Sequence, residues 1–94
     1  MTLLSDDEVA EGLRGSQWAR ERDEIVRDLT FADFAAAIAF VNAVADAAEA
    51  ANHHPDILVH GWNKVRLSLS THSEGGLTAG DLAMARTLDA LPGG

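Results

Sequence analysis

The sequence predicts an α+β domain in which a four-stranded antiparallel sheet carries three helices on one face, in the order α-β-β-α-β-β-α. Three hydroxyl residues are each followed three positions later by an acidic residue, a pattern typical of helix starts. One long segment repeats apolar residues at helical spacing, and another alternates apolar and polar residues like a strand with one buried face. The 94 residues are expected to form a single domain, 1–94, because so short a chain has room for one core.

Each element follows from a local pattern. The residues expected to begin helices are Ser5, Thr30 and Thr78, with their acidic partners Glu8, Asp33 and Asp81. A tight turn at Asp23-Glu24 and a break at Pro55 are expected to bound the strands. In chain order, the expected elements are a short helix ended by Gly12 and Gly15, strands Trp18–Arg22 and Ile25–Leu29, a helix Phe31–Ala51, strands Ile57–His60 and Val65–Thr71, and a helix Thr78–Leu91.

The core is expected where the apolar faces of these elements meet. Eleven of the twenty-one residues in the long helix are alanine, which favours helix and allows close approach of another element. The expected core positions are Phe31, Phe34, Ile38, Val41 and Ala45 in the long helix, with Phe40 and Val44 beside them, then Val65, Leu67, Leu69 and Thr71 in the last strand, and Leu82, Ala85, Leu88 and Leu91 in the last helix.

Composition limits the class of protein. Fifteen acidic against seven basic residues give a formal net charge of −8, which would repel phosphate backbones and anionic lipid surfaces, so no direct nucleic-acid partner is expected. The absence of cysteine excludes disulfides and thiolate chemistry. The N-terminus lacks a basic signal-peptide region, and no apolar stretch is expected to reach the roughly 18–20 residues of a membrane span. We therefore expect a cytoplasmic protein without membrane contact.

Histidines gather in the second half of the sequence. His53 and His54 follow the long helix, and His72 ends the polar face of the last strand. Glu49 lies in the last turn of the long helix, where the helix dipole disfavours an anion, so it is expected to pair with one of the two imidazoles that follow. Imidazole can both donate and accept protons near neutral pH, which suits elimination of water from a small molecule.

Other chemistries fit the same residues less well. Adjacent histidines in an extended segment point to opposite faces, which disfavours a zinc site. Ser70 lies near His72 but lacks an acid to complete a triad, and Gly75-Gly76 is too short to cradle a pyrophosphate. Each candidate also has a structural interpretation: a surface histidine or glutamate is commonly only solvated, and Asp81 is the capping partner of Thr78.

The spacing of these residues is specific when they are taken together. Glu49 is followed after three residues by His53-His54-Pro55, after six more by Trp62, after nine more by His72, and then by Asp81. This arrangement resembles the signature of the pterin-4a-carbinolamine dehydratases, and the similarity extends over essentially the whole chain from Leu3. Further matching segments are Trp18, Phe31-Ala32-Asp33-Phe34, Phe40-Val41, Asn63-Lys64-Val65, Ser70-Thr71-His72 and Gly76-Leu77-Thr78.

The resemblance implies dehydration of 4a-hydroxytetrahydropterin to quinonoid dihydropterin, which recycles the cofactor of aromatic amino acid hydroxylases. The pterin is then the substrate, so neither a metal nor an organic cofactor is expected. The resemblance also implies a homodimer or homotetramer, to which the alanine-rich helix could contribute. A link to an aromatic amino acid hydroxylase follows from the same reaction.

The resemblance further implies roles for individual residues. His53 and His72 would be the main acid–base pair around the 4a-hydroxyl and N5, and which of them is acid or base stays open. His54 would complete the imidazole cluster, and Glu49 would orient a histidine. The implied substrate contacts are Trp18, Asn52, His53, His54, Ser70, Thr71, His72, Ser73 and Asp81.

Two positions depart from the pattern of some members. Asn52 stands where some carry aspartate, and Gly80 where some carry arginine, and we expect these changes to tune activity rather than abolish it. The alternative hypothesis is a protein-interaction module. Animal members also act as dimerisation cofactors for a homeodomain transcription factor, and relatives that lost the histidines act as assembly factors.

Overall fold

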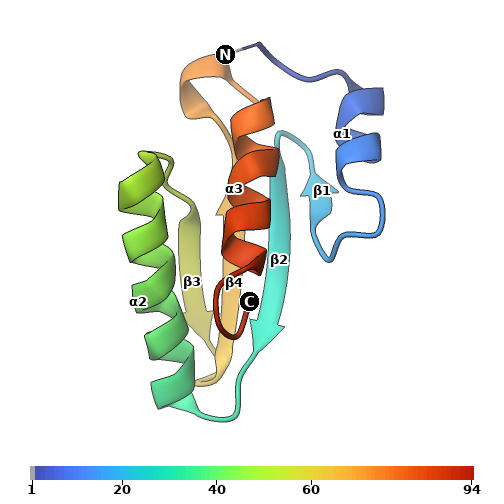
Figure 1. Cartoon of the computed structure of the whole chain (residues 1–94). Coiled ribbons are helices and arrows are strands. Elements are labelled where there is room, and N and C mark those ends of the chain that lie inside the picture. Colours follow the sequence, from blue (N-terminus) through green and yellow to red (C-terminus); the bar gives the residue numbers. More distant parts are fainter. Residues whose placement is uncertain (1) are drawn as a thin grey trace.

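Four strands form one antiparallel sheet in the order β1-β2-β4-β3 (Figure 1). The computed structural model describes residues 2–94. The strands are β1 (Ala19–Glu21), β2 (Glu24–Thr30), β3 (Asp56–His60) and β4 (Lys64–Leu69). The helices are α1 (Asp6–Gly12), α2 (Phe34–Ala51) and α3 (Ala79–Asp89), with a 3₁₀ turn, η1 (His72–Glu74), before α3. The predicted α+β class and the order of its elements are confirmed.

Two of the three predicted helix starts are confirmed. Ser5 and Glu8 form a reciprocal capping box at α1, as Thr78 and Asp81 do at α3. The start predicted at Thr30 is wrong, because Thr30 pairs with Lys64 as the last residue of β2. Asp33 caps α2 instead, and its side chain accepts a hydrogen bond from Ala36 N at 2.7 Å.

Two turns differ from the prediction. The β1–β2 hairpin turns at Arg22-Asp23, not Asp23-Glu24, because Glu21 pairs with Glu24. Arg22 takes the left-handed conformation there, at φ 57°. At the other end of the chain, β4 stops at Leu69, and His72 lies in η1 rather than on the strand. The chain turns because Thr71 N bonds to Gly76 O at 2.9 Å, around the left-handed Gly75.

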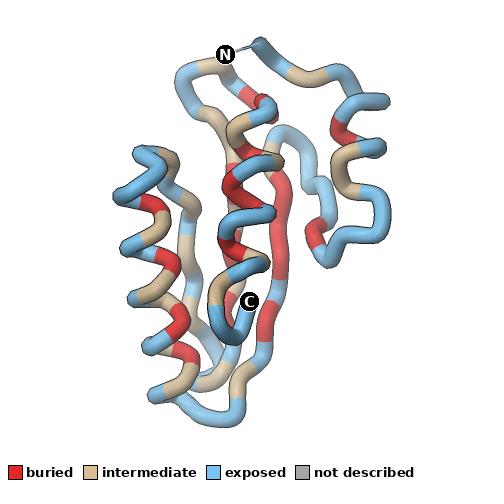
Figure 2. Tube along the Cα trace, in the orientation of Figure 1, coloured by how far each residue is buried: buried red, intermediate tan, exposed pale blue. Residues whose placement is uncertain are grey.

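The core lies between the sheet and the helices α2 and α3 (Figures 1 and 2). The predicted alternation of β4 is confirmed, since Val65, Leu67 and Leu69 are buried. The main stripe predicted for α2 is confirmed only in part. Phe31 and Val41 are half-buried against the core, but Phe34 is 54% exposed. The buried positions are Ala37, Phe40, Val44 and Ala48. The small alanines let α2 lie close to the sheet, so the face they share with Phe40 and Val44 is the one that packs.

Helix α2 is also the one described helix long and apolar enough to cross a membrane, by length and composition alone. The expectation that no stretch reaches this length is therefore wrong. The helix carries Asp46 and Glu49, and one of its faces packs into the core. Only 22% of its residues are buried, however, so a large apolar surface of α2 faces outward.

Candidate active site

One end of the sheet brings most of the candidate residues together. Asp56, the first residue of β3, pairs with Ser68 near the end of β4. The residues just before β3 and just after β4 therefore lie at the same end of the sheet. His53 and His54 belong to the first group and His72 to the second, while the start of α3 approaches the same end through contacts with Thr71.

A sharp bend after α2 places His53 and His54. Asn52 caps the helix in the left-handed conformation (φ 49°, ψ 43°), which asparagine tolerates better than most residues. His53 N bonds back to Ala48 O at 3.1 Å, so the helix ends at a fixed point. Asn52 and His53 line a hollow of about 370 Å³ between the end of α2 and α3.

The carboxylate of Asp81 is the centre of a buried network. Asp81 has no exposed surface. Its Oδ1 lies 2.7 Å from His53 Nε2, and its Oδ2 accepts hydrogen bonds from Thr71 Oγ1 at 2.8 Å and from the Thr78 amide at 2.9 Å. Thr71 and Thr78 are joined by a further hydrogen bond of 2.8 Å between their hydroxyls. Asp81 is completely enclosed, so it offers no surface for direct contact with a substrate, and its link to the surface runs through His53.

His54 has a different partner, Glu49. Its Nε2 forms a hydrogen bond with Glu49 Oε2, as the position of Glu49 in the sequence predicted for one of the two imidazoles. The two side chains are 55% and 77% exposed. An ion pair so open to water contributes little, about 0–1 kcal/mol, so it orients His54 only weakly.

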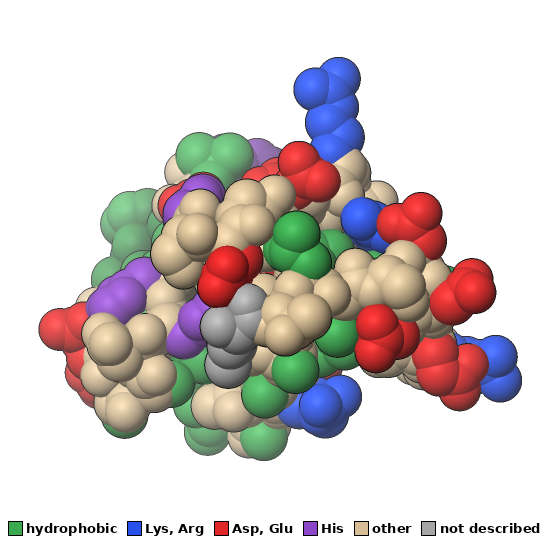
Figure 3. Space-filling view, turned by 90° about the horizontal axis from the view of Figure 1, so that it is seen from above, with side chains coloured by type: hydrophobic (Ala, Val, Ile, Leu, Met, Phe, Trp, Pro, Cys, Tyr) green, Lys and Arg blue, Asp and Glu red, His purple; other side chains and the backbone are tan. Residues whose placement is uncertain are grey.

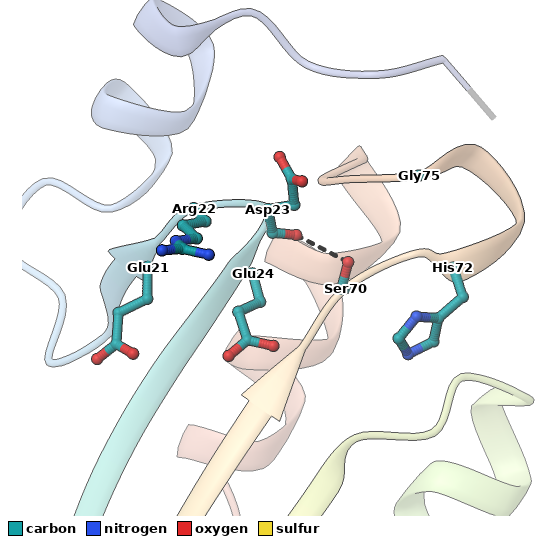
Figure 4. Close-up of a pocket in the computed structure, with 7 residues that line it drawn as sticks. All are labelled: Glu21, Arg22, Asp23, Glu24, Ser70, His72 and Gly75. Atoms are coloured by element: carbon teal, nitrogen blue, oxygen red, sulfur yellow. Dashed lines mark hydrogen bonds between the residues drawn. The ribbon is translucent and has the colours of Figure 1, made fainter.

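His72 lines a separate, larger hollow of about 660 Å³, within the usual range of ligand pockets. The β1–β2 turn supplies most of the remaining lining, and Figure 4 shows the His72 ring at the far side of the hollow, pointing toward the chain that follows α2. The lining residues are Glu21, Arg22, Asp23, Glu24, Ser70, His72 and Gly75. Three carboxylates against one guanidinium make this surface negative, which attracts positive charge.

His53 and His72 line different hollows, but a hydrogen-bond network joins His53 to the residue before His72. Thr71 immediately precedes His72, and its hydroxyl shares the carboxylate of Asp81 with His53. Seen from above, histidine side chains gather on one side of this end of the molecule, next to acidic ones (Figure 3).

Of the other predicted substrate contacts, Ser70 and Ser73 lie close to His72, and Trp18 lies far from it. Ser70 lines the His72 hollow, and its hydroxyl donates to Asp23 O at 2.7 Å; Ser73 lies exposed in η1. The structure does not bring Trp18 to this end of the sheet. Its Nε1 donates to Asp89 Oδ1 at 2.9 Å, and Asp89 lies eight residues after Asp81, roughly 12 Å further along α3 at 1.5 Å per residue.

The residues Glu21 to Glu24 were not among the sequence-based candidates. They border the His72 hollow because β2 pairs antiparallel with β4, with Ile25 opposite Leu69. The turn before β2 therefore comes level with the segment after β4. The signal available in the sequence was a hairpin turn made of four charged residues, but its neighbour in space depends on strand order, which local patterns do not give.

Among residues 2–94, no group of three or more His, Asp or Glu side chains is placed to hold a metal ion. The arrangement that is present is imidazole with carboxylate and hydroxyl partners. Such a set can hold, orient and transfer protons. The fold and site thus define a class: a small α+β protein with histidines bonded to carboxylates at one end of its sheet.

Comparison with known proteins specifies that class. Residues 2–91 match the family model described as pterin 4 alpha carbinolamine dehydratase. A protein of Chloroflexus aurantiacus is 51% identical over 94 residues (99% of this chain and 100% of its own), and one of Nocardia farcinica is 50% identical over 90 residues (95% and 94%). Both carry the provisional name pterin-4-alpha-carbinolamine dehydratase.

Solved structures agree. The crystal structure of a transcriptional coactivator/pterin dehydratase from Brucella melitensis matches with a TM-score of 0.87 and 36% identity, covering 95% of this chain and 97% of that one. A pterin dehydratase-like RuBisCO assembly factor shares the fold, with a TM-score of 0.63 and 24% identity over 78% of this chain and 83% of that one. The chain belongs to the pterin-4a-carbinolamine dehydratase family, a family of hydro-lyases, as its histidine spacing predicted.

Proposed function

We propose that this protein dehydrates 4a-hydroxytetrahydropterin to quinonoid dihydropterin by histidine acid–base catalysis. The observation that carries the proposal is the placement of His53 on the buried Asp81, whose second oxygen is bound by Thr71, the residue next to His72. A buried carboxylate that bonds one imidazole, next to the segment that carries a second imidazole, supports a role in proton transfer.

The reaction breaks two bonds of the substrate. The C4a–O bond breaks and the oxygen leaves as water after taking a proton from one imidazole. The N5–H bond breaks as the other imidazole accepts the N5 proton. The electron pair of the N5–H bond then forms the C4a=N5 double bond. No net proton is gained or lost, so His53 and His72 are restored by a proton transfer between them or through solvent.

The other candidate residues would bind and orient the pterin. His54, bonded to Glu49, would complete the imidazole cluster, and Ser70, Ser73 and Asn52 offer polar groups at the same end of the sheet. The pterin itself supplies the reacting atoms, so no cofactor takes part. We place the reaction in tetrahydropterin recycling beside an aromatic amino acid hydroxylase in the cytoplasm.

The test is turnover of carbinolamine generated enzymatically in the presence of the purified chain. We expect the wild type to accelerate its decay, and His53→Ala and His72→Ala each to lose roughly 10²–10⁴-fold of that acceleration, the usual contribution of a general acid or base. His60→Ala is the matched control. His60 is exposed at the opposite end of β3 and should keep wild-type activity.

The decay is followed by absorbance at substrate concentrations above and below KM. A wild-type chain that does not exceed buffer would refute the proposal. So would a His72→Ala variant as active as the His60→Ala control.

A protein-interaction role is the second candidate, favoured by large apolar side chains left at the surface. Phe34, Leu58 and Trp62 are 54%, 53% and 61% exposed, and Trp62 takes a left-handed conformation (φ 57°) in the β3–β4 turn. An exposed tryptophan fixed at the tip of a hairpin is a typical anchor for a protein partner. A stoichiometric partner recovered by pull-down from a chain without pterin turnover would make this role the main one.

A further inference from the structure

We infer that the turn between β1 and β2 selects the pterin by the charge of its side chain at C6. Uncharged or positively charged side chains are accepted, and side chains that end in a phosphate or a carboxylate are opposed. This inference rests on the proposed function, because it names the class of pterin that the same site takes. The residues that carry it are Asp23 and Glu24, to which the proposed reaction gives no role.

The hollow beside His72 has room for more than a bicyclic ring. Its volume of about 660 Å³ is in the range of pockets that hold a drug-sized ligand, and an unsubstituted pterin is smaller than such a ligand. In Figure 4 the His72 ring points toward the chain that follows α2, and the β1–β2 turn forms the other side of the hollow. C6 is bonded to N5, one of the reacting atoms. With these atoms beside His72, the side chain at C6 therefore begins within reach of the turn.

The turn has a fixed position relative to His72. The Ser70 hydroxyl donates a hydrogen bond to Asp23 O at 2.7 Å, which ties the turn to the chain two residues before His72. The loop between β1 and β2 has two residues, and the length of a hairpin loop fixes the register of its strands. The carboxylates of Asp23 and Glu24 are therefore held at one side of the hollow.

Two of the three carboxylates in the lining have no cation to neutralise them. Glu21 forms an ion pair with Arg66, with 2.5 Å between nitrogen and oxygen. Asp23 and Glu24 have no ion-pair partner among residues 2–94. Arg22 is the only arginine or lysine that lines the hollow. Its single positive charge against these two carboxylates leaves the hollow with a net negative charge.

The size of the effect follows from Coulomb's law. A negative group held ~4 Å from one carboxylate loses roughly fivefold in affinity at the dielectric constant of water. With two carboxylates partly offset by Arg22, we expect roughly tenfold. Glu24 is half-buried, so salt screens its charge less than that of an exposed group. A neutral hydroxyl instead donates a hydrogen bond to a carboxylate, which stabilises a hydroxylated side chain.

The first test compares two carbinolamines that differ by one phosphate. Both carry a trihydroxypropyl side chain at C6, either free or esterified with phosphate at its terminal hydroxyl. We expect the kcat/KM of the wild type to be roughly tenfold higher for the free form at low ionic strength. Added salt should shrink this ratio, because it screens the charges. The ratio within one variant does not depend on how much of that variant is folded.

The second test removes the two charges. Asp23→Asn and Glu24→Gln, combined in one chain, keep the shapes of the side chains. We expect the ratio to fall to about one or lower, because the charge that then remains is that of Arg22. Glu11→Gln combined with Asp46→Asn removes the same net charge from α1 and α2, outside the hollow, and should keep the wild-type ratio. An unchanged ratio in the first double variant, or an equal loss in the control, would overturn the inference.

Binding of the corresponding oxidised pterins, which cannot be dehydrated, separates this inference from the proposed function. Titration calorimetry should show the same preference for the free side chain, and its loss in Asp23→Asn/Glu24→Gln. Turnover without a preference in rate or binding would overturn the inference and leave the proposed function intact. A preference in binding without turnover would overturn the proposed function alone. A chain with neither turnover nor pterin binding would overturn both.

Discussion

At the scale of single residues, two buried charged groups show how this small chain holds them. Asp81 is surrounded by three donors and lies at the candidate site. Arg27, 8% exposed on the core side of β2, instead bonds Asp89 at 2.5 Å and Gln17 at 3.0 Å, while its Nε has no partner among the described residues. Trp18 donates to the same oxygen of Asp89. This second network joins β2, α3 and the segment before β1.

Removing Asp89 should therefore destabilise the fold without touching the chemistry. Asp89→Ala leaves Arg27 and the Trp18 indole without their acceptor, and we expect about 2–4 kcal/mol of lost stability, below the upper end for buried pairs because Asp89 is partly exposed. Asp89→Asn keeps an acceptor and should lose about half as much. Urea unfolding measures both. Equal stability of Asp89→Ala and wild type would contradict this account, and folded Asp89→Asn should retain its kcat.

At the scale of elements, local patterns predicted what depends on neighbours in sequence. The capping boxes at Ser5 and Thr78, the alternation of β4 and the histidine spacing are of this kind. The start of α2 was missed because Thr30 and Asp33 are both good caps, and only pairing of Thr30 with Lys64 decides between them. Likewise the partner of His53 is 28 residues away, beyond any local pattern.

The choice between the two caps can be measured directly. Asp33→Ala removes the acceptor for Ala36 N, and we expect it to cost about 1 kcal/mol, the usual value for an N-cap. Thr30→Val keeps a β-branched residue at an exposed strand end and should change stability by less than about 0.5 kcal/mol. Thermal unfolding of both variants checks this. A larger loss of stability for Thr30→Val than for Asp33→Ala would show that Thr30 is the N-cap of α2.

At the scale of the whole molecule, α2 has two apolar stripes and the sheet covers one of them. Ala37, Phe40, Val44 and Ala48 are buried in the core. The second stripe, predicted from the sequence as core and spaced by four, three and four, runs along Phe34, Ile38, Val41 and Ala45 and is half-buried or exposed. Apolar surface at this spacing on an outward face is typical of a helix that packs against another protein chain.

We expect this second stripe to join copies of the chain into the dimer or tetramer that the family resemblance implies. Phe34→Glu and Ala45→Glu place a charge on the stripe and should dissociate the assembly in sedimentation or light scattering. Phe34 lies in the first turn of α2, where an acid favours the helix, so the monomer should stay folded. Ala35→Glu, exposed on another face of α2, is the control and should leave the assembly intact. A wild-type chain that is monomeric at micromolar concentration would show that the stripe binds a different partner or none. If that monomer is active, a single chain holds the complete site.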